Sequence, residues 1–326
     1  MKFKKIEKFY LFGSGENMHF FADKIKKKLN VKIYIFMFTG HKNEKYKNFN
    51  LADYYKKLKI NFRYINDPNT YFSKKKINNS IAICFGSKWV YKDFIIKKFE
   101  HGIYNINPIP FPNYMGGAHF TWQILNSDFN GGIYFQQITN KLDRGAILDK
   151  KKIAIKKDSK YPEDYFKIYN PQIKKFLVKI LRKIEEKKEF SKVGSIDLFS
   201  RRIYFPRLNT NINGYINWDW NIDEIVRFCR AFSYPYSGAK TFHNNKIVSI
   251  QEIEIYKRKK FHPFCNGIII RKNLDKIYVS HRSGILLIKK ILDKKNEIIN
   301  WEFKQGDRIY TKKSALEKSY TYRQKS

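Results

Sequence analysis

Apolar runs of strand length alternate with amphipathic stretches of helix length in the first third of the chain. The runs Lys8–Gly13, Val31–Phe38, Asn61–Ile65 and Ser80–Phe85 favour strands, and the periodicity predicts helices at Asn17–Leu29, Ala52–Leu58 and Val90–Phe99. Neighbouring parallel strands need a crossover connection, which is usually a helix. The alternation therefore predicts an α/β fold with a Rossmann-like, mostly parallel sheet and helices on both faces.

Polar residues follow several of these strands. Phe85-Gly86-Ser87 and Asn105-Ile106-Asn107 form loops, and Asp143 connects two further predicted strands at Gly131–Ile138 and Ala146–Ile155. In open parallel sheets, binding sites form where the carboxyl ends of the strands open into loops. Gly13-Ser14-Gly15 also follows a strand, but a third Gly and a clear acidic partner are missing, which favours a plain strand-turn-helix crossover over a dinucleotide loop.

A long helix and a second unit complete the predicted organisation. Asn170 as N-cap and Pro171 predict the start of the helix, whose apolar stripe comprises Ile173, Phe176, Leu177, Ile180, Leu181 and Ile184. We predict a catalytic domain over residues 1–200, ending in a polar linker over 189–205. A small β-barrel domain, OB-like, is predicted over 201–312, and a loose basic tail over 313–326.

The expected elements of the barrel are short and separated by turns. They are a helix at Asp223–Phe232, strands at Lys246–Tyr256, Gly267–Ile270, Lys276–Ser280 and Gly284–Lys289, and a closing strand at Phe303–Asp307.

Composition excludes some classes of protein and leaves others open. Hydrophobic residues make up 43% of the chain, which excludes a disordered protein. Lys plus Arg total 66 against 29 Asp plus Glu, a net charge of +37. This charge attracts polyanions, but Lys, Asn, Ile, Phe and Tyr are all abundant, so AT-rich codon usage is the favoured explanation. The three cysteines show no zinc or disulfide spacing. We expect no metal, no membrane span and a cytoplasmic location.

Two residue types suggest chemistry at the predicted loops. The amide of Asn105 can donate a hydrogen bond to a developing oxyanion, and the carboxylate of Asp143 can take a proton from an attacking amine. Taken singly, each residue is better explained by a turn. Their order and spacing with other residues decide between these explanations.

The segment 104–117, followed by 142–148, resembles the folate-dependent formyltransferases. This family includes methionyl-tRNA formyltransferase and the amino-sugar N-formyltransferases, and its pattern is roughly Asn-x-His-x-Ser-Leu-Leu-Pro-x-Tyr-Arg-Gly, then Asp-x-Gly. The matching residues are Asn105, Pro112, Tyr114, Gly116, Asp143 and Gly145. Asn107 replaces the family His and Met115 the family Arg. An Asn can donate a hydrogen bond but cannot relay a proton.

The second half carries the resemblance further. Ile216-Asn217-Trp218 and Arg230–Ala239 are similar to the family's Ile-Asp-Trp and Arg-Ala-x-x-x-Pro-Tyr-x-Gly-Ala, so the resemblance covers about residues 8–312. Two histidines lie near the segment in which Asn107 replaces the family His. We expect His101 to be exposed, and His119 could turn toward the site in place of the missing imidazole.

The resemblance implies transfer of a formyl group from 10-formyltetrahydrofolate to a primary amine. It implies three sets of site residues. The catalytic residues would be Asn105, Asn107 and Asp143; the folate would be bound by Phe85, Gly86, Ser87, Thr139, Asn140, Leu142 and Asp143; and the acceptor would be bound by Tyr114, Gly116, Gly117 and Trp122.

The acceptor stays open at this point. A nucleotide-linked amino sugar is favoured by Trp122, because the tRNA enzymes usually lack that aromatic residue, and by the opening Phe12-Gly13-Ser14-Gly15. The net charge favours initiator methionyl-tRNA instead. A third alternative is a weak or inactive relative that binds folate or nucleotide without turnover. A homodimer is possible in each case.

Overall fold

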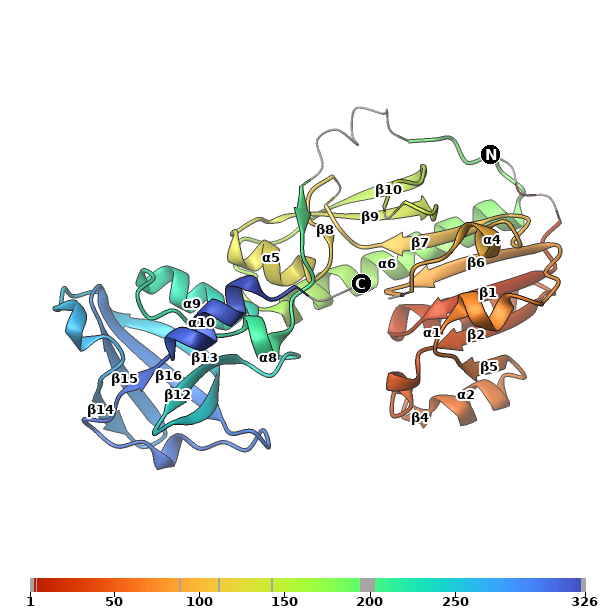
Figure 1. Ribbon diagram of the computed structural model, residues 1–326. Coiled ribbons are helices and arrows are strands. Elements are labelled where there is room, and N and C mark those ends of the chain that lie inside the picture. The colour runs from red at the N-terminus through yellow and green to blue at the C-terminus, as the bar shows by residue number, and fades with distance from the viewer. Residues whose placement is uncertain are drawn as a thin grey trace.

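Two sheets organise the computed structural model, which describes residues 3, 5–87, 89–110, 112–141, 143–193 and 203–323 (Figure 1). The first sheet has seven strands in the order β10-β9-β7-β6-β1-β2-β5. Its strands are β1 (Lys8–Gly13), β2 (Lys32–Met37), β5 (Asn61–Tyr64), β6 (Ser80–Phe85), β7 (Ile103–Asn107), β9 (Asn130–Gln137) and β10 (Ile147–Ala154). The five adjacent strands β7, β6, β1, β2 and β5 are parallel to one another, whereas β9 runs antiparallel to both of its neighbours, β7 and β10. The predicted α/β fold class is confirmed.

Helices cover both faces of this sheet. Phe9 and Leu11 of β1 belong to one buried cluster, which includes residues of α1 (Glu16–Lys28), α2 (Leu51–Lys57) and α6 (Pro162–Glu185). Tyr10 and Phe12 belong to a second cluster, with residues of α3 (Pro68–Phe72) and α4 (Asp93–Ile96). Because successive side chains of a strand point to opposite faces, β1 must be apolar at every position. Helix α4 is much shorter than the predicted Val90–Phe99.

The long helix begins earlier than the sequence predicts. Helix α6 starts at Pro162, and the Asp164 carboxylate accepts hydrogen bonds from the backbone N–H groups of Lys160 and Tyr161 at 2.9 and 3.0 Å. Asn170 is not an N-cap; its side chain instead accepts a hydrogen bond from Asn17 at 3.0 Å. The apolar stripe is buried as predicted and continues backward through Tyr165 and Tyr169, so packing outweighs the loss of one backbone hydrogen bond at Pro171.

The second sheet is antiparallel and curls into a half-barrel, in the order β14-β15-β16-β13-β12-β17. Its strands are β12 (Ala239–His243), β13 (Lys246–Lys257), β14 (Ile269–Asn273), β15 (Lys276–His281), β16 (Gly284–Leu292) and β17 (Ile309–Tyr310). Helix α9 (Ile222–Ala231) packs against β13. The Asn221 and Glu224 side chains cap its first turn reciprocally.

Two expectations for the end of the chain are wrong. Phe303–Asp307 is a turn, in which Asp307 accepts a hydrogen bond from the Lys304 N–H at 2.9 Å, and the strand that closes the sheet edge is β17, two residues later. The predicted loose tail forms helix α10 (Lys313–Thr321), which packs on α8 (Thr210–Asn213). The Asn213 amide donates to the Ser319 carbonyl at 2.7 Å. This buried tertiary contact fixes a segment that has little apolar periodicity of its own.

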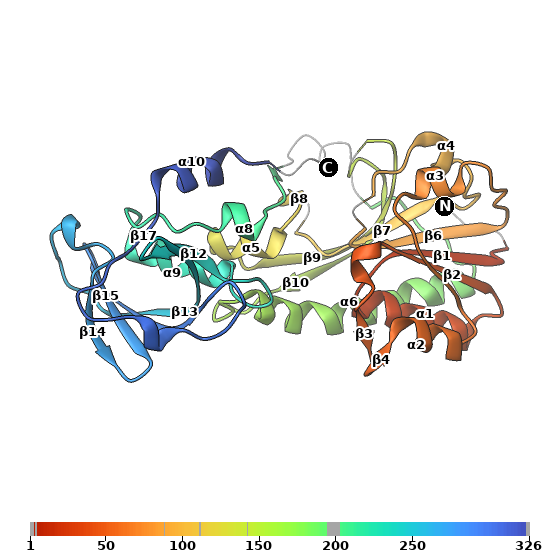
Figure 2. The ribbon, with the colours of Figure 1, turned by 60° about the horizontal axis from the view of Figure 1, so that its bottom comes forward.

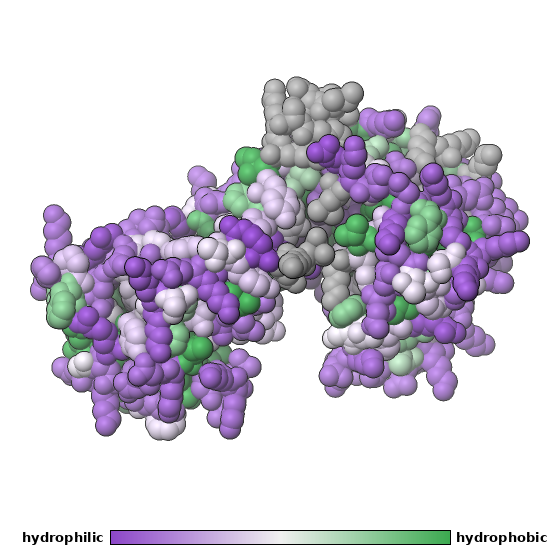
Figure 3. All heavy atoms as spheres, in the orientation of Figure 1, coloured by the Kyte–Doolittle hydropathy of each residue, from purple (hydrophilic) through white to green (hydrophobic). Residues whose placement is uncertain are grey.

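The two sheets are linked by helix packing and by a short strand pair (Figure 2). Helix α5 (His119–Leu125) contacts α9, and β8 (Met115–Gly116) pairs in parallel with β11 (Tyr204–Phe205). The remaining elements are the strands β3 (Lys45–Tyr46) and β4 (Phe49–Asn50) and the 3₁₀ turns Thr39–His41, Pro263–Cys265 and Asn300–Glu302. Hydrophilic residues cover most of the face in Figure 3. Among the described helices, none is both long and apolar enough to cross a membrane.

Candidate active site

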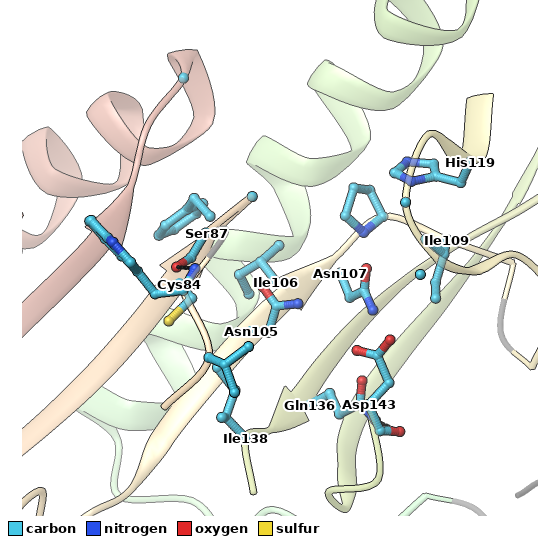
Figure 4. Close-up of a pocket in the computed structure, with 18 of the residues that line it drawn as sticks. Cys84, Ser87, Asn105, Ile106, Asn107, Ile109, His119, Gln136, Ile138 and Asp143 are labelled. Carbon is cyan, nitrogen blue, oxygen red and sulfur yellow. Dashed lines mark hydrogen bonds between the residues drawn. The ribbon is translucent and has the colours of Figure 1, made fainter. Parts of the chain in front are cut away.

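A cavity of about 330 Å³ lies at the carboxyl edge of the parallel strands (Figure 4). Its walls include the loops after β1, β6 and β7, the Gly116–His119 segment and the turn between β9 and β10. The strand order reverses between β1 and β6, because successive crossovers place β2 and β5 on one side and β6 and β7 on the other. The cavity therefore occupies the position at which open α/β sheets bind ligands.

Strand register brings the polar side chains of the cavity together. Asn105 of β7 pairs with Cys84 of β6 and with Gln136 of β9, so these three side chains form a lateral row on one face of the sheet. Asn107 lies two residues further along the same face. Both amides line the cavity, and among the described residues neither side chain has a hydrogen-bond partner. Two amide groups are therefore available to a ligand.

Asp143 reaches the same cavity from the β9–β10 turn. The Gln136 amide donates hydrogen bonds to the backbone carbonyls of Asp143 at 2.9 Å and Gly145 at 3.1 Å. Asp143 has a left-handed backbone with φ of 51°, a conformation that Asp tolerates better than most residues. Figure 4 shows that the Asn107 amide and the Asp143 carboxylate point into one space. Asn105 and Asp143 thus share a cavity, as the proposed chemistry requires.

The expected folate-binding residues do not all line the cavity. Phe85, Gly86, Ser87 and Thr139 line it. Asn140 turns away, and its amide donates to the Asp93 carboxylate at 2.9 Å. Leu142 lies outside the described residues.

Only some of the residues expected to bind the acceptor line the cavity. Gly116 and Gly117 line the cavity, whereas Tyr114 and Trp122 do not. The Tyr114 ring stacks on Phe205 at 5.1 Å between centroids, and the Trp122 indole donates to the Pro206 carbonyl at 2.9 Å. These two aromatic residues hold the β11 segment beside the cavity. A Cβ at Gly116 would lie 2.2 Å from the Phe205 carbonyl oxygen, so only Gly permits this close approach.

Arg207, which follows β11, is a cavity residue that the sequence did not indicate. It is exposed, and among the described residues no carboxylate pairs with it. Its position depends on the pairing of β11 with β8, which brings together segments about 90 residues apart in the chain. The sequence also did not indicate Gln136 as a cavity residue, because strand register decides which residues lie beside it.

Two histidines differ in their relation to the site. His119 lines the cavity, and its Nε2 is buried without a hydrogen-bond partner. Burial lowers the pKa of His119 to about 4, so the imidazole is neutral at pH 7. The expectation that His101 is exposed is wrong, because its ring packs edge-on against Phe3, with centroids 5.9 Å apart, and is buried.

The Gly13-Ser14-Gly15 turn is a strand-turn-helix crossover, as predicted. Gly13 ends β1, and Gly15 precedes α1. The Glu44 carboxylate accepts hydrogen bonds from the Ser14 hydroxyl, the Gly15 N–H at 3.0 Å and the His19 ring at 2.9 Å. Burial disfavours ionisation of Glu44, but the hydrogen bonds from His19 and Ser14 outweigh it and keep its pKa below the usual value. The Glu44 carboxylate thus accepts the hydrogen bonds that the same groups of a dinucleotide-binding loop would donate to a phosphate.

Metal-binding groups are not clustered in the described part of the chain. Within those residues, no group of three or more His, Cys, Asp and Glu side chains has the arrangement of a metal site. The polar groups of the cavity include amides, hydroxyls, one carboxylate, one imidazole and one guanidinium, which suit the recognition of an organic substrate.

Known proteins resemble the chain in both halves. The profile of the formyl transferase C-terminal domain matches residues 210–312. The methionyl-tRNA formyltransferase of Rickettsia massiliae is 26% identical over 235 residues, which are 72% of this chain and 74% of the relative. That of Treponema denticola is also 26% identical, over 247 residues that cover 72% of this chain and 73% of the relative.

Solved structures show the same fold. WlaRD, a sugar 3N-formyltransferase crystallised with dTDP and 5-N-formyl-THF, superimposes with a TM-score of 0.62 at 18% identity, covering 87% of this chain and 97% of WlaRD. The N-formyltransferase of Helicobacter canadensis, in complex with folinic acid and dTDP-3-aminofucose, gives a TM-score of 0.61 at 18% identity, covering 87% and 98%. Together with the motif and the cavity, these similarities support a folate-dependent formyltransferase.

Proposed function

We propose that the protein transfers the formyl group of 10-formyltetrahydrofolate to the primary amine of a nucleotide-linked amino sugar. The observation that carries the proposal is the shared cavity of Asn105, Asn107 and Asp143. Two unpartnered amides and a carboxylate meet there, at the edge of the sheet where α/β proteins bind small molecules.

The chemical roles follow from these groups. The neutral amine attacks the formyl carbon, and a new C–N bond forms while the carbonyl oxygen becomes negative. Asn105 and Asn107 donate hydrogen bonds to this oxygen. Asp143 takes the proton that the amine nitrogen loses. The bond from the formyl carbon to the folate nitrogen then breaks, and that nitrogen gains a proton. In this scheme Asn107 supplies a hydrogen bond where the family His stands, and proton transfer falls to Asp143.

The folate would lie along one wall of the cavity. Phe85, Gly86, Ser87 and Thr139 would contact its ring system, and the neighbouring Trp89 and Ile138 side chains give this wall an apolar surface. Such a mixture of apolar walls and a few polar groups is typical of sites for flat heterocyclic ligands.

Arg207 supports a phosphate-bearing acceptor. Its guanidinium is a cation at the cavity without a carboxylate partner among the described residues, and guanidinium groups bind phosphate in a bidentate manner. The two sugar N-formyltransferase structures, whose ligands carry dTDP, match over almost their whole length. These observations favour a nucleotide-linked amino sugar.

Initiator methionyl-tRNA is the second candidate acceptor. The sequence relatives at 26% identity are methionyl-tRNA formyltransferases, and the net charge of +37 attracts a polyanion. Binding of tRNA would weaken steeply with salt, because each phosphate contact releases counterions. Measuring acceptor binding at two salt concentrations therefore separates this candidate from the first.

A protein that binds folate or nucleotide without turnover is the third candidate, because Asn107 cannot relay a proton. The deciding experiment incubates the purified protein with 10-formyltetrahydrofolate and a panel of amines, including dTDP-amino sugars and methionyl-tRNA. The amount of tetrahydrofolate and the mass of each acceptor are followed.

We expect one nucleotide-linked sugar to gain the mass of one formyl group, and we expect Asp143→Asn to abolish the gain. A folded wild-type protein that binds formyl-folate but modifies no acceptor would instead establish the binding protein.

A further inference from the structure

A second, smaller cavity lies where the two halves of the protein meet. Its volume is about 180 Å³, and it shares no lining residue with the cavity around Asn105. Three segments enclose it: the connection from β10 to α6, the end of α5 with the loop that follows, and one side of α9. The catalytic proposal makes no use of this cavity.

Four cationic side chains line this cavity. Lys157 and Lys160 come from the β10–α6 connection, and Arg227 and Arg230 come from α9. The two arginines are three residues apart on the helix and therefore share a face. No Asp or Glu lines the cavity. Like charges that converge without a counter-ion repel one another, so an anion in this cavity would be strongly favoured.

Arg230 provides a second, independent observation. Its Nε is buried and has no hydrogen-bond partner, and among the described residues no carboxylate forms an ion pair with its guanidinium. A buried donor without an acceptor costs about 1–3 kcal/mol. The neighbouring Ser159 is buried, and its hydroxyl makes no hydrogen bond to a described residue. One buried donor at this cavity, the Arg230 Nε–H, thus lacks an acceptor.

Three carboxylates of the surrounding segments make contacts outside this cavity. Asp164 accepts hydrogen bonds from the Lys160 and Tyr161 backbone. Asp128 accepts two hydrogen bonds from Asn130, both at 2.9 Å. Asp223 forms a bidentate pair with Arg258, at 2.7 and 3.0 Å. None of the three lines the cavity.

We propose that this cavity binds a phosphate group. A tetrahedral dianion accepts several hydrogen bonds at once, and arginine pairs are the usual partners of phosphate in proteins. Ile124, Phe129 and Tyr165 provide an apolar floor that limits competition by water. The ligand would join α9 to the β10–α6 connection and so tie the two halves together.

The source of the phosphate is either free phosphate or a mononucleotide. A wider groove adjoins the cavity and shares Ser127 and Arg227 with it, and aromatic residues line this groove, namely Trp122, Tyr215, Trp220, Phe228, Phe232 and Tyr320. An aromatic base can stack there while its phosphate occupies the cavity. Both sources share the chemistry of the phosphate group.

The test is isothermal titration of the full-length protein with inorganic phosphate, AMP and adenosine at fixed ionic strength. We expect phosphate to bind, and Arg230→Met to weaken its binding at least about tenfold through the loss of a charge-assisted donor. The double variant Lys157→Met with Lys160→Met should weaken binding similarly. Because both lysines are exposed, this variant remains informative if Arg230→Met fails to fold. The exposed Arg282→Met is the matched control and should bind as the wild type does.

Two results would overturn the proposal. One is the absence of phosphate binding to folded wild-type protein. The other is an affinity that the cavity variants change no more than Arg282→Met does. If the variants weaken binding as expected, tighter binding of AMP than of phosphate, with adenosine weak, identifies a mononucleotide as the ligand. Equal binding of AMP and phosphate identifies free phosphate.

Discussion

The side-chain amide of Gln136 donates a hydrogen bond to the backbone carbonyl of Asp143 at 2.9 Å. The same amide also reaches the Gly145 carbonyl, so one strand residue holds the part of the turn that carries the carboxylate. Gln136 lies beside Asn105 in the sheet. The distance between the amide and the carboxylate at the site is therefore set by the sheet rather than by a mobile loop.

Replacing Gln136 tests this arrangement. Gln136→Leu keeps the size of the side chain but leaves two carbonyl groups without their donor, at a cost of about 1–3 kcal/mol in the free energy of unfolding. We also expect kcat to fall, because Asp143 is no longer fixed. Urea unfolding and formyl-transfer kinetics measure the two effects. Gln172→Leu on α6 is the control, and a Gln136→Leu protein with wild-type turnover would contradict the role.

Asn105→Ala removes a donor from the proposed oxyanion site. We expect kcat to fall about a hundred- to a thousand-fold, the usual effect of losing one such group. The affinity for formyl-folate should change little, because the interaction strengthens only as the oxygen becomes negative. Single-turnover rates and folate titration separate these two quantities. Weaker folate binding with unchanged kcat would instead show a binding role for Asn105.

Gly145→Ala should distort the Asp143 turn. A Cβ at Gly145 would lie 1.7 Å from the Gln137 carbonyl oxygen, so the backbone must move. We expect a large loss of formyl transfer and a lower unfolding temperature. Gly40→Ala meets only the Phe38 side chain at 3.2 Å and is the control. If Gly145→Ala is as active as Gly40→Ala, the position of the turn does not limit catalysis.

Stability should depend on pH through His119. Burial lowers its pKa to about 4, against a usual value of 6.5. Between these two values the unfolded chain binds a proton that the folded protein does not. The free energy of unfolding should therefore fall as pH falls through this range, by up to about 1.4 kcal/mol per pH unit.

His119→Gln removes this contribution, so its unfolding free energy should depend less on pH between 6.5 and 4. Urea unfolding at four pH values compares it with the wild type and with the exposed His262→Gln as control. Identical slopes for wild type and His119→Gln would show that His119 is protonated in the folded protein as readily as in the unfolded chain.

Arg207→Met tests the acceptor class. If Arg207 binds the phosphate of a nucleotide-linked sugar, the KM for that acceptor should rise about tenfold or more, with little change in the KM for formyl-folate. Steady-state kinetics with each substrate varied in turn provide both values. An equal rise in both would place Arg207 at the folate instead.

The fold and the centre of the site were largely predictable, for physical reasons. Strands buried on both faces are apolar throughout, so Lys8–Gly13 and Ser80–Phe85 could be recognised directly. Asn105 and Asp143 could be singled out because they occur in a family motif, but the predicted loop Asn105-Ile106-Asn107 is wrong, because these residues pair with β6 and β9 as the end of β7. The start of α6 was missed because Asn170-Pro171 is a strong local signal that packing overrides. The tail helix α10 was missed because contacts with α8 stabilise it.

The sequence by itself determined which segments become buried strands and which polar residues follow them, since hydrophobic periodicity and turn chemistry act over a few residues. Only the tertiary structure decided which polar residues meet. Gln136 reaches the Asp143 turn through strand register, and Arg207 reaches the cavity through the pairing of β11 with β8. Likewise, α9 and the β10–α6 connection together surround a cavity with positive charge. Such contacts join residues far apart in the chain, and no local pattern encodes them.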